Sequence, residues 1–484
     1  MRRAKIVTTL GPASHEPSII LDLLNAGANV IRINMSHGDQ DEHTETIQRV
    51  RAAAEQLKKP LAVLIDLSGP KIRTRTLEGG QPVFLETNAE FTITTRSISG
   101  NASIVSTTYV GLPQDVQPGT QLLLDDGAIE LFVERTDGTD VTCRVVNGGL
   151  LGERKGINLP GITLPVPSLT EKDRVDLKWA VRQQAEYIAL SFVRRAEDCT
   201  EAKELIAAEQ AKSGVDDGRP IPLIAKIEKA EAIRNLREIV EAADGLMVAR
   251  GDLGVETGVE NVPVYQKRII EEANAADKFV ITATQMLQSM ISSPRPTRAE
   301  ASDVANAIWD GTDAVMLSSE TATGAYPVLT VQTMVRIIET AEQNRGSLLH
   351  SQAKWRGTRT ENFRRALCEA AVSAAEEMRT VSTIAVYTAS GQMARSLAAL
   401  RPAQRIVALT PLKSVSNELS AIWGVESLIL PECKTTEELV RTGEQALLNA
   451  GMATPGDLVV LMAGRLSGMG LSRSIKLHEI ESKY

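Results

Sequence analysis

The sequence predicts an α/β protein: a parallel (β/α)8 TIM barrel that carries an inserted all-β lid domain and is followed by a separate C-terminal α/β domain. Three observations lead to this prediction. Eight short apolar runs alternate with helix-like segments, and continuous apolar runs are typical of parallel strands buried on both faces. The alternation breaks once, for a stretch that carries only strand and turn signals. A shorter α/β pattern begins after about residue 342.

Composition limits the class of protein. A chain of 484 residues is too long for one hydrophobic core, so two or three domains are expected. A net charge of -8 and the lack of a basic run argue against a nucleic-acid partner. No apolar stretch approaches the roughly 18 residues of a membrane span, so we expect no membrane partner and a cytoplasmic location. The four cysteines are scattered, which predicts neither a zinc site nor disulfides.

The eight apolar runs are expected to be the barrel strands. They are Ile6–Leu10, Val30–Met35, Leu61–Leu67, Tyr187–Phe192, Leu223–Glu228, Gly245–Ala249, Phe279–Thr284 and Ala314–Ser318. Ser168 with Glu171, and Thr297 with Glu300, fit capping boxes at the starts of two of the intervening helices. A barrel places its chemistry where its strands end. Unusual polar residues stand at those ends: Arg32, Asn34, Asp66, Glu228, Asp252, Thr284 and Glu320.

Three domains are expected. Their boundaries are 1–69 with 166–342 for the barrel, 70–165 for an inserted β-barrel lid, and 343–484 for a C-terminal regulatory or oligomerisation domain. The insert holds alternating or β-branched runs such as Phe91–Thr95, and Gly69-Pro70 and Pro160-Gly161 are typical of hinges. A small domain hinged over a barrel mouth can act as a lid.

The C-terminal part repeats helix and strand signals after a polar linker at 343–357. Its expected elements are a helix at Phe363–Met378, strands at Thr383–Thr388, Arg405–Leu409, Asp457–Met462 and Ile475–Ile480, and a helix that starts at Thr435. This order indicates a separate α/β domain.

The stretch from Pro222 to Glu256 carries the main functional signal. Lys226 and Glu228 are two positions apart in a strand and therefore share a face. Glu228 and Asp252 end consecutive strands, and paired carboxylates at strand ends suit Mg²⁺. Gly251 would let the backbone approach a ligand closely, and the helix start that follows can bind an anion. The alternative is that Lys226 and Glu228 form a structural ion pair.

A set of motifs in order makes the chain resemble the pyruvate kinase family over nearly all its length. The motifs are 3–14, 31–37, 66–73, 155–160, 224–228, 247–256 and 283–287 with the segment that continues to Glu320. The resemblance implies the last step of glycolysis, in which phosphoenolpyruvate and ADP give pyruvate and ATP. It also implies dependence on Mg²⁺, with Mn²⁺ as a substitute, and a homotetramer.

The resemblance also implies roles for the strand-end residues. Glu228 and Asp252 would hold Mg²⁺, Lys226 would stabilise the moving phosphoryl group, and Arg32 would clamp the phosphate. The backbone N–H groups of Gly251 and Asp252, with the Thr284 hydroxyl, would bind the substrate carboxylate. The residues implied for the nucleotide are Asn34, Met35, Ser36, His37, Arg73 and Lys155. For His37 alone, a helix-cap or core histidine remains the alternative.

One departure from the family concerns the monovalent cation. Family members that need K⁺ hold it at positions corresponding to Asn34, Ser36, Asp66 and Leu67, and carry Glu where this chain has Lys71. Because a lysine ammonium is a compact cation, we expect Lys71 to replace K⁺, so that K⁺ is not required. The alternative is a solvated hinge lysine.

The turn Thr388-Ala389-Ser390-Gly391 lies between a predicted strand and helix, an arrangement that can hold a phosphate. By resemblance, Thr388, Ser390 and Gly391 would receive the phosphate of a sugar-phosphate or AMP effector. Ala389 and the loop 464–470 depart from the pattern of fructose-bisphosphate-regulated relatives, and an ordinary βα turn is the alternative.

Two other functions remain open at this point. A barrel lyase or aldolase acting on pyruvate or phosphoenolpyruvate would share the metal carboxylates, but it would have no use for Arg73 and Lys155 over the barrel mouth. A non-catalytic metabolite sensor would not need to keep Lys226 beside Glu228, Asp252 and Thr284.

Overall fold

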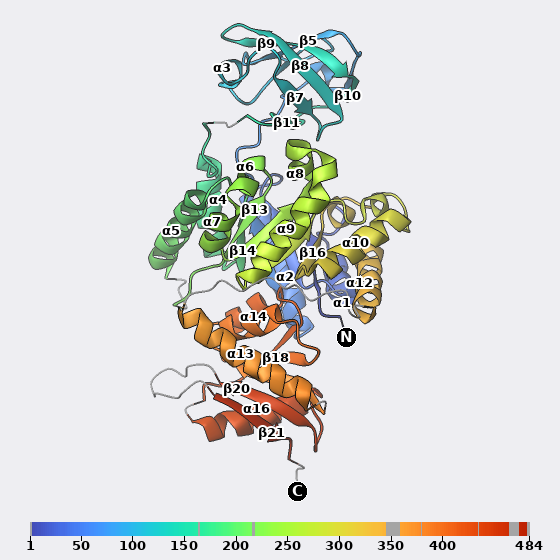
Figure 1. Cartoon of the computed structure of the whole chain (residues 1–484). Helices are drawn as coiled ribbons and strands as arrows, with labels where there is room; N and C mark the ends of the chain where they lie inside the picture. Colours follow the sequence, from blue (N-terminus) through green and yellow to red (C-terminus); the bar gives the residue numbers. More distant parts are fainter. Residues whose placement is uncertain are drawn as a thin grey trace.

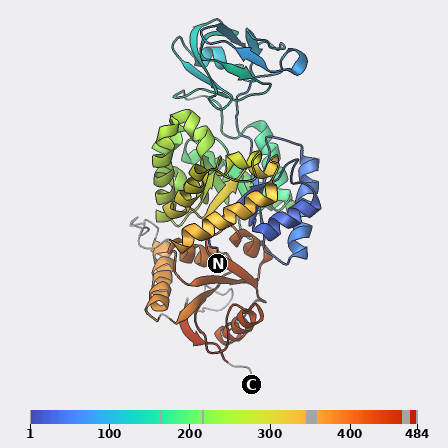
Figure 2. The ribbon, with the colours of Figure 1, turned by 90° about the vertical axis from the view of Figure 1, so that its right-hand side faces the viewer.

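The computed structural model describes residues 2–162, 165–214, 218–344, 359–378, 380–433, 435–463 and 474–481. Three parts follow one another in a row, with the barrel in the middle (Figure 1). The inserted β domain stands at one end and the C-terminal α/β domain at the other, and a view turned by 90° shows the same row (Figure 2).

Eight parallel strands close into a barrel, which confirms the predicted fold class. Around the barrel their order is β1-β16-β15-β14-β13-β12-β3-β2. Their bounds are β1 (Lys5–Thr9), β2 (Val30–Asn34), β3 (Ala62–Asp66), β12 (Tyr187–Leu190), β13 (Leu223–Ile227), β14 (Gly245–Ala249), β15 (Phe279–Ala283) and β16 (Ala314–Leu317). Seven strands fall inside the predicted apolar runs, and β1 begins one residue before its run, at Lys5. The agreement arises because burial on both faces leaves a continuous hydrophobic signal.

Helices cover the outside of the barrel. They are α1 (Pro17–Ala26), α2 (Gln40–Gln56), α4 (Glu171–Arg182), α5 (Ala196–Ser213), α6 (Ala230–Arg234), α7 (Leu236–Ala242), α8 (Arg250–Thr257), α9 (Val262–Ala275), α10 (Arg298–Asp310), α11 (Ser319–Ala322) and α12 (Pro327–Gln343), with 3₁₀ turns η2 (Val259–Asn261) and η3 (Gln288–Ile291). No helix in the described ranges is both long and apolar enough to cross a membrane.

The two predicted capping boxes had different outcomes. The Thr297 hydroxyl accepts from the Glu300 amide at the start of α10, and the Glu300 carboxylate accepts from the Thr297 amide, as predicted. The box at Ser168 and Glu171 was wrong, because α4 is capped two residues later by Thr170 with Asp173. Ser168 is buried and donates to the carbonyl of Phe192 instead. The tertiary contact of Ser168 therefore decided where the helix begins.

The inserted β domain contains two sheets. A six-stranded sheet has the order β11-β7-β8-β9-β5-β6, and a two-stranded sheet pairs β10 with β4. The bounds are β4 (Val83–Leu85), β5 (Glu90–Thr94), β6 (Ile104–Ser106), β7 (Gln121–Leu124), β8 (Ile129–Thr136), β9 (Asp140–Asn147), β10 (Gly149–Leu151) and β11 (Ile157–Asn158), with η1 (Glu78–Gly80) and α3 (Leu112–Asp115). The domain buries its own hydrophobic core, which includes Phe91 and Leu131.

The C-terminal domain is a five-stranded sheet with helices. The strand order is β19-β18-β17-β20-β21, and only β21 runs antiparallel to its neighbour. The elements are α13 (Arg359–Glu377), β17 (Val381–Tyr387), α14 (Gln392–Ala399), β18 (Arg405–Thr410), α15 (Lys413–Leu419), β19 (Val425–Ile429), α16 (Thr436–Asn449), β20 (Leu458–Ala463) and β21 (Ser474–Glu479). Sequence analysis missed β19. The expected linker from 345 onward and the loop 464–470 lie outside the described residues.

The C-terminal domain packs against one end of the barrel. Buried residues of the barrel interior and of this domain form one hydrophobic cluster. The Tyr187 hydroxyl donates to the Glu418 carbonyl at 2.8 Å, and Lys5 Nζ donates to the Val425 carbonyl at 2.7 Å. Since β1 and β12 begin at these contacts, the C-terminal domain covers the amino ends of the strands. The carboxyl ends face the inserted β domain (Figure 1).

The cap of α10 gives a prediction about local stability. Replacing Thr297 by alanine removes the side-chain acceptor of the Glu300 amide and should cost about 1 kcal/mol. We expect amides in the first turn of α10 to exchange about fivefold faster, measured by hydrogen exchange and mass spectrometry. Thr297→Ser keeps the hydroxyl and is the matched control. Equal exchange in the alanine variant and the wild type would contradict the assignment of this cap.

Candidate functional site

A cavity of about 290 Å³ lies between the carboxyl ends of the barrel strands and the inserted β domain. It brings together most of the residues singled out in the sequence. Its lining includes Arg32, Asn34, Ser36, His37, Leu67, Lys71, Arg73, Lys155, Lys226, Glu228 and Asp252. Met35 is not part of this lining: its side chain is buried, and its carbonyl accepts a hydrogen bond from Lys172.

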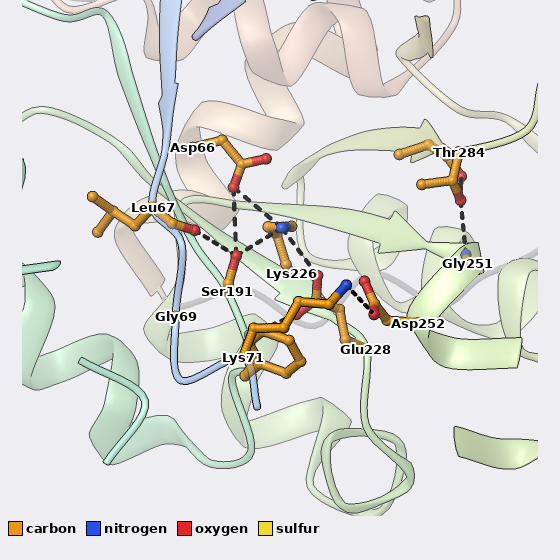
Figure 3. A network of polar contacts seen from close by, with 12 residues as sticks. Asp66, Leu67, Gly69, Lys71, Ser191, Lys226, Glu228, Gly251, Asp252 and Thr284 are labelled. Atoms are coloured by element: carbon orange, nitrogen blue, oxygen red, sulfur yellow. Dashed lines mark hydrogen bonds and ion pairs between the residues drawn. The ribbon is translucent and has the colours of Figure 1, made fainter. Parts of the chain in front are cut away.

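The Lys226 ammonium is the centre of the polar network in this cavity. It projects from β13 and donates to Ser191 Oγ at 2.7 Å. It also forms ion pairs with Glu228 Oε1 at 3.0 Å and Asp66 Oδ1 at 3.2 Å. Figure 3 shows the three acceptors converging on one nitrogen. Lys226 and Glu228 are therefore an ion pair, as the alternative interpretation held, but one that lines a cavity.

Burial and charge act in opposite directions on these groups. Burial alone would lower the pKa of Lys226, but Asp66 and Glu228 raise it above its ordinary value. Burial alone would raise the pKa of Asp66, but the nearby Lys226 and Arg32 hold it below its ordinary value. At neutral pH the Lys226 ammonium and the Asp66 carboxylate are therefore both charged.

Arg32 is held at the same point. Its Nε donates to Asp66 Oδ2 at 2.7 Å, and its NH1 donates to Thr9 Oγ1 at 3.0 Å. Arg32 comes from β2, Asp66 ends β3 and Thr9 ends β1, so three neighbouring strands fix this guanidinium. Part of it still lines the cavity, where it can bind an anion.

Glu228 and Asp252 form a two-carboxylate set. Burial raises the pKa of Glu228 despite the Lys226 ammonium, and the negative charge of Asp252 raises it further. A divalent cation would relieve this repulsion, so the donor set fits Mg²⁺, which takes few carboxylates and leaves other positions to substrate oxygens and water. Among the described residues, no group of three or more His, Cys, Asp or Glu side chains could hold a metal ion.

Two of the groups predicted to bind the substrate carboxylate form a hydrogen bond with each other. The Gly251 N–H donates to Thr284 Oγ1 at 2.8 Å (Figure 3), so it already has a partner. Thr284 has a φ of 71°, a left-handed conformation that is rare for a β-branched residue. A Cβ built on Gly251 would lie 3.6 Å from Thr284 Oγ1. The Thr284 hydroxyl in turn donates to the Ala283 carbonyl at 2.6 Å.

Lys71 enters the cavity beside Asp252. Its Nζ lies 3.3 Å from Asp252 Oδ1 and 3.9 Å from Asp126 Oδ1. Both oxygens of Asp66 instead face other cations, Arg32 and Lys226. The structure therefore does not bring Lys71 onto Asp66. The backbone of Lys71 follows the Gly69 hinge and places the side chain over Asp252 (Figure 3).

Except for Met35, the residues implied for the nucleotide line the cavity from two sides. Asn34 Oδ1 accepts from the Ser36 amide at 3.1 Å and thereby shapes the loop after β2. Burial and the nearby Arg73, Arg32 and Lys71 lower the pKa of His37, so its ring is neutral at pH 7. From the inserted β domain, Lys155 pairs with Asp125 at 2.9 Å.

Arg73 also belongs to the inserted β domain, and it binds the backbone of its own domain. Its NH1 donates to the Arg154 carbonyl at 3.2 Å.

Two side chains at the barrel mouth, Arg250 and Glu320, do not enter the cavity. Arg250 donates to the carbonyls of Ala283 and Thr284, and Glu320 accepts from the amides of Leu287 and Ser318. Both support the loops after β15 and β16.

Sequence reasoning missed Ser191 and Phe192. Ser191 Oγ donates to the Leu67 carbonyl at 2.6 Å and accepts from Lys226. The amide of Phe192 donates to Glu228 Oε2 at 2.7 Å, and Phe192 has a φ of 56°. The available signal was a serine at the end of the apolar run 187–192. No sequence pattern indicated that the backbone of Phe192 is strained.

The predicted effector turn lies in the C-terminal domain. The Gly391 amide donates to Thr388 Oγ1 at 2.9 Å, and Gly391 has a φ of 76° at the start of α14. The loop 464–470, which sequence analysis associated with this turn, lies outside the described residues. The described geometry is a tight βα turn and leaves the effector expectation untested.

Comparisons with known proteins agree across the chain. The family model described as the pyruvate kinase barrel domain matches residues 1–331, and that described as the pyruvate kinase alpha/beta domain matches residues 365–478. Pyruvate kinase from Geobacillus stearothermophilus is 43% identical, and pyruvate kinase 2 from Synechocystis sp. is 42% identical. Each match covers 99% of this chain and 80% of the relative.

A solved structure gives the same result. The crystal structure of a pyruvate kinase from Cryptosporidium parvum superposes with a TM-score of 0.88 at 34% sequence identity. The match covers 99% of this chain and 96% of that chain.

The network around Lys226 gives a prediction about coupling. Lys226→Met leaves Asp66 and Glu228 buried without their shared cation and should cost about 3–5 kcal/mol. Adding Asp66→Asn removes one of the two carboxylate charges left without Lys226. The double variant should therefore be destabilised by about 1–3 kcal/mol less than the sum of the two single-variant destabilisations. The measurement is hydrogen exchange of β3 and β13 amides.

A less buried ion pair provides the control. Lys203 pairs with Asp244 at 2.9 Å, with each side chain about one-third exposed. Lys203→Met should therefore cost less than about 1 kcal/mol. Strict additivity of the Lys226 and Asp66 variants would contradict the coupling.

Proposed function

The chain belongs to the pyruvate kinase family, and we propose that it transfers the phosphoryl group of phosphoenolpyruvate to ADP, giving pyruvate and ATP. The observation that carries the proposal is the Lys226 ammonium, held by Asp66, Glu228 and Ser191 in a cavity that also contains Arg32. Such a cation is permanently charged, fixed in place and able to reach a ligand.

Charge balance supports this substrate pair. Phosphoenolpyruvate and ADP together bring about six negative charges. The six Lys and Arg side chains that line the cavity exceed its four carboxylates by two. Two divalent cations, one on the protein and one with the nucleotide, would supply the remaining four charges. The cavity is therefore suited to two polyanions rather than to a neutral substrate.

Lys226 acts as an electrostatic catalyst in this proposal. Its ammonium contacts the oxygen that bridges the enolate and the phosphoryl group, and neutralises charge that spreads over the phosphoryl oxygens in a loose transition state. Because Asp66 and Glu228 raise its pKa, Lys226 keeps its proton and does not serve as the acid. Arg32 binds the phosphate and holds it in line for attack.

Glu228 and Asp252 would hold the magnesium ion, with Mn²⁺ as a substitute. The ion would supply positive charge that stabilises the negative charge developing on the substrate. Glu228 is oriented for this role by the Phe192 amide, and Asp252 by its place at the start of α8. The Lys71 ammonium, now on Asp252 Oδ1, would then move off that oxygen.

The substrate carboxylate would lie at Gly251, Asp252 and Thr284. It would take the Gly251 N–H from Thr284 Oγ1, and that oxygen, whose proton is donated to the Ala283 carbonyl, could then accept from a water near the enolate carbon. A water bound there would deliver the proton that turns enolpyruvate into pyruvate. The nucleotide would lie between the barrel and the inserted β domain, against Asn34, Ser36 and His37 on one side and Arg73 and Lys155 on the other.

Three further proposals rest on the family resemblance. The enzyme would assemble as a homotetramer and act in the cytoplasm. A sugar phosphate or AMP would bind at Thr388, Ser390 and Gly391 and regulate it. The tight turn with Gly391 in a left-handed conformation is compatible with phosphate binding.

The reaction is tested by a pyruvate-release assay coupled to lactate dehydrogenase. We expect turnover that requires phosphoenolpyruvate, ADP and Mg²⁺ together. Lys226→Met should lower kcat about 10²–10³-fold with little change in KM, since Lys226 acts mainly in the transition state. Lys203→Met is the control and should keep wild-type kcat. Pyruvate release without ADP would instead support a lyase or aldolase.

The second test concerns the monovalent cation. We propose that the Lys71 ammonium supplies, within the cavity, the charge that K⁺ supplies in other family members. At about 4 Å and an effective dielectric near 20, such a charge is worth roughly 4 kcal/mol against a phosphate oxygen. We expect full activity in a K⁺-free tetramethylammonium buffer and K⁺-dependent activity in Lys71→Glu. Activation of the wild type by K⁺ of about tenfold or more, a difference of about 1.4 kcal/mol, would refute the proposal.

A further inference from the structure

A second cavity, of about 90 Å³, lies in the hinge between the barrel and the inserted β domain. Both hinge segments contribute to its wall, with residues 70–72 on the segment that leaves the barrel and residues 157–159, which include β11, on the segment that returns. The barrel contributes Phe192, the start of α6 and Glu256 of α8. The volume is about six times what one water needs. A small organic molecule therefore fits.

The wall contains a polar group without a partner. Asn158 is 5% exposed, and its Oδ1 forms no hydrogen bond within the described residues. Its Nδ2 donates to Glu256 Oε1 at 3.4 Å, which fixes the amide orientation and leaves Oδ1 as an acceptor. Burying an acceptor without a donor is unfavourable, because the acceptor loses its hydrogen bond to water. A ligand with an N–H or O–H donor would remove that cost.

The rest of the wall defines the ligand further. Ile72, Leu159 and Phe192 are apolar and buried, so they favour an apolar body. Lys229 of the wall is neutralised by Glu256 at 2.5 Å. Arg234 is exposed on the wall, and its guanidinium forms no ion pair within the described part of the chain. A carboxylate on the ligand would give Arg234 a partner.

Phe192 joins this hinge cavity to the metal carboxylate. Phe192 lines both cavities, and its backbone amide donates a hydrogen bond to Glu228 Oε2 at 2.7 Å. It also packs on the hinge itself, because a Cβ built on Gly69 would lie 2.6 Å from Phe192 Cδ2. A φ of 56° is a strained conformation for a bulky residue and persists only where the surroundings impose it. Whatever occupies the hinge cavity therefore acts on the residue that orients Glu228.

We propose that the hinge cavity is a binding site for small apolar carboxylic acids that carry an N–H or O–H donor, and that its occupancy changes metal affinity at Glu228. The donor binds Asn158 Oδ1, the apolar body packs between the hinge segments and Phe192, and the carboxylate pairs with Arg234. Because the site includes both hinge segments, a bound ligand also fixes the inserted β domain relative to the barrel. The binding part of this proposal does not depend on the proposed reaction.

The test uses indole-3-acetate, which has an apolar ring, one N–H donor and one carboxylate. Isothermal titration calorimetry on the full chain should show saturable binding at one site. 1-Methylindole-3-acetate lacks the donor and should bind about tenfold more weakly. Phosphoenolpyruvate should not displace the probe, which distinguishes the hinge cavity from the substrate cavity.

Variants locate the site. Arg234→Met should weaken binding about fivefold, whereas Arg237→Met, a nearby exposed arginine that does not line the cavity, should not. Ala230→Leu adds bulk at the start of α6 and should abolish binding, with an unchanged melting temperature showing that the variant is folded. Arg234 and Ala230 take no part in the proposed reaction, so basal activity should be unchanged in both variants.

The coupling has its own readout. Saturating indole-3-acetate should change the Kd for Mn²⁺ about fivefold, and by linkage Mn²⁺ should change the Kd for the probe by the same factor. No saturable binding up to about 10 mM, equal binding of the N-methyl analogue, or displacement by phosphoenolpyruvate would overturn the site. An unchanged Mn²⁺ affinity would overturn the coupling.

Discussion

The interaction on which the rest of the site depends is the buried ammonium of Lys226 between the carboxylates of Asp66 and Glu228. A charge in that position is costly unless it is compensated, and here each group compensates the others. Asp66 also holds Arg32, and Glu228 belongs to the two-carboxylate set with Asp252. Removing any one of these charges would leave its partners unbalanced. The side of the cavity proposed for the phosphate and the side proposed for the metal are thus parts of one network.

The barrel makes this network possible by ending eight strands at one edge. Arg32 on β2 and Asp66 on the neighbouring β3 lie within ion-pair distance, and Lys226 reaches Asp66 from β13, two strands away, without long loops. The loops then add backbone groups in strained conformations. Phe192 and Thr284 both have positive φ values, and both lie where a backbone group orients a functional side chain. The inserted β domain completes the cavity from the other side, and its hinge packs on Phe192.

Much of this was predictable from the sequence, and the exceptions have physical reasons. The eight barrel strands were found because burial on both faces leaves unbroken apolar runs. Strand β19 was missed because Val425–Ile429 is short and half-polar. The cap of α4 was predicted at Ser168 because the local pattern fits a capping box. In the structure the Ser168 hydroxyl instead donates to the carbonyl of Phe192, a residue distant in the sequence. For Lys71 the sequence indicated a cation in place of K⁺, but it did not indicate that the ammonium would lie on Asp252. Positions of flexible side chains and strained backbones depend on the whole fold, which local patterns do not report.

The central claim is that Glu228 and Asp252, with part of their charge compensated by Lys226, form the binding site of a divalent cation. Titration of the protein with Mn²⁺, followed by electron paramagnetic resonance without substrates, tests this most directly. We predict one site per chain whose affinity falls about tenfold or more in both Glu228→Gln and Asp252→Asn. Asp303→Asn, which removes the distant partner of Arg250, should leave it unchanged. Equal Mn²⁺ affinity in the wild type and the two carboxylate variants would contradict the account.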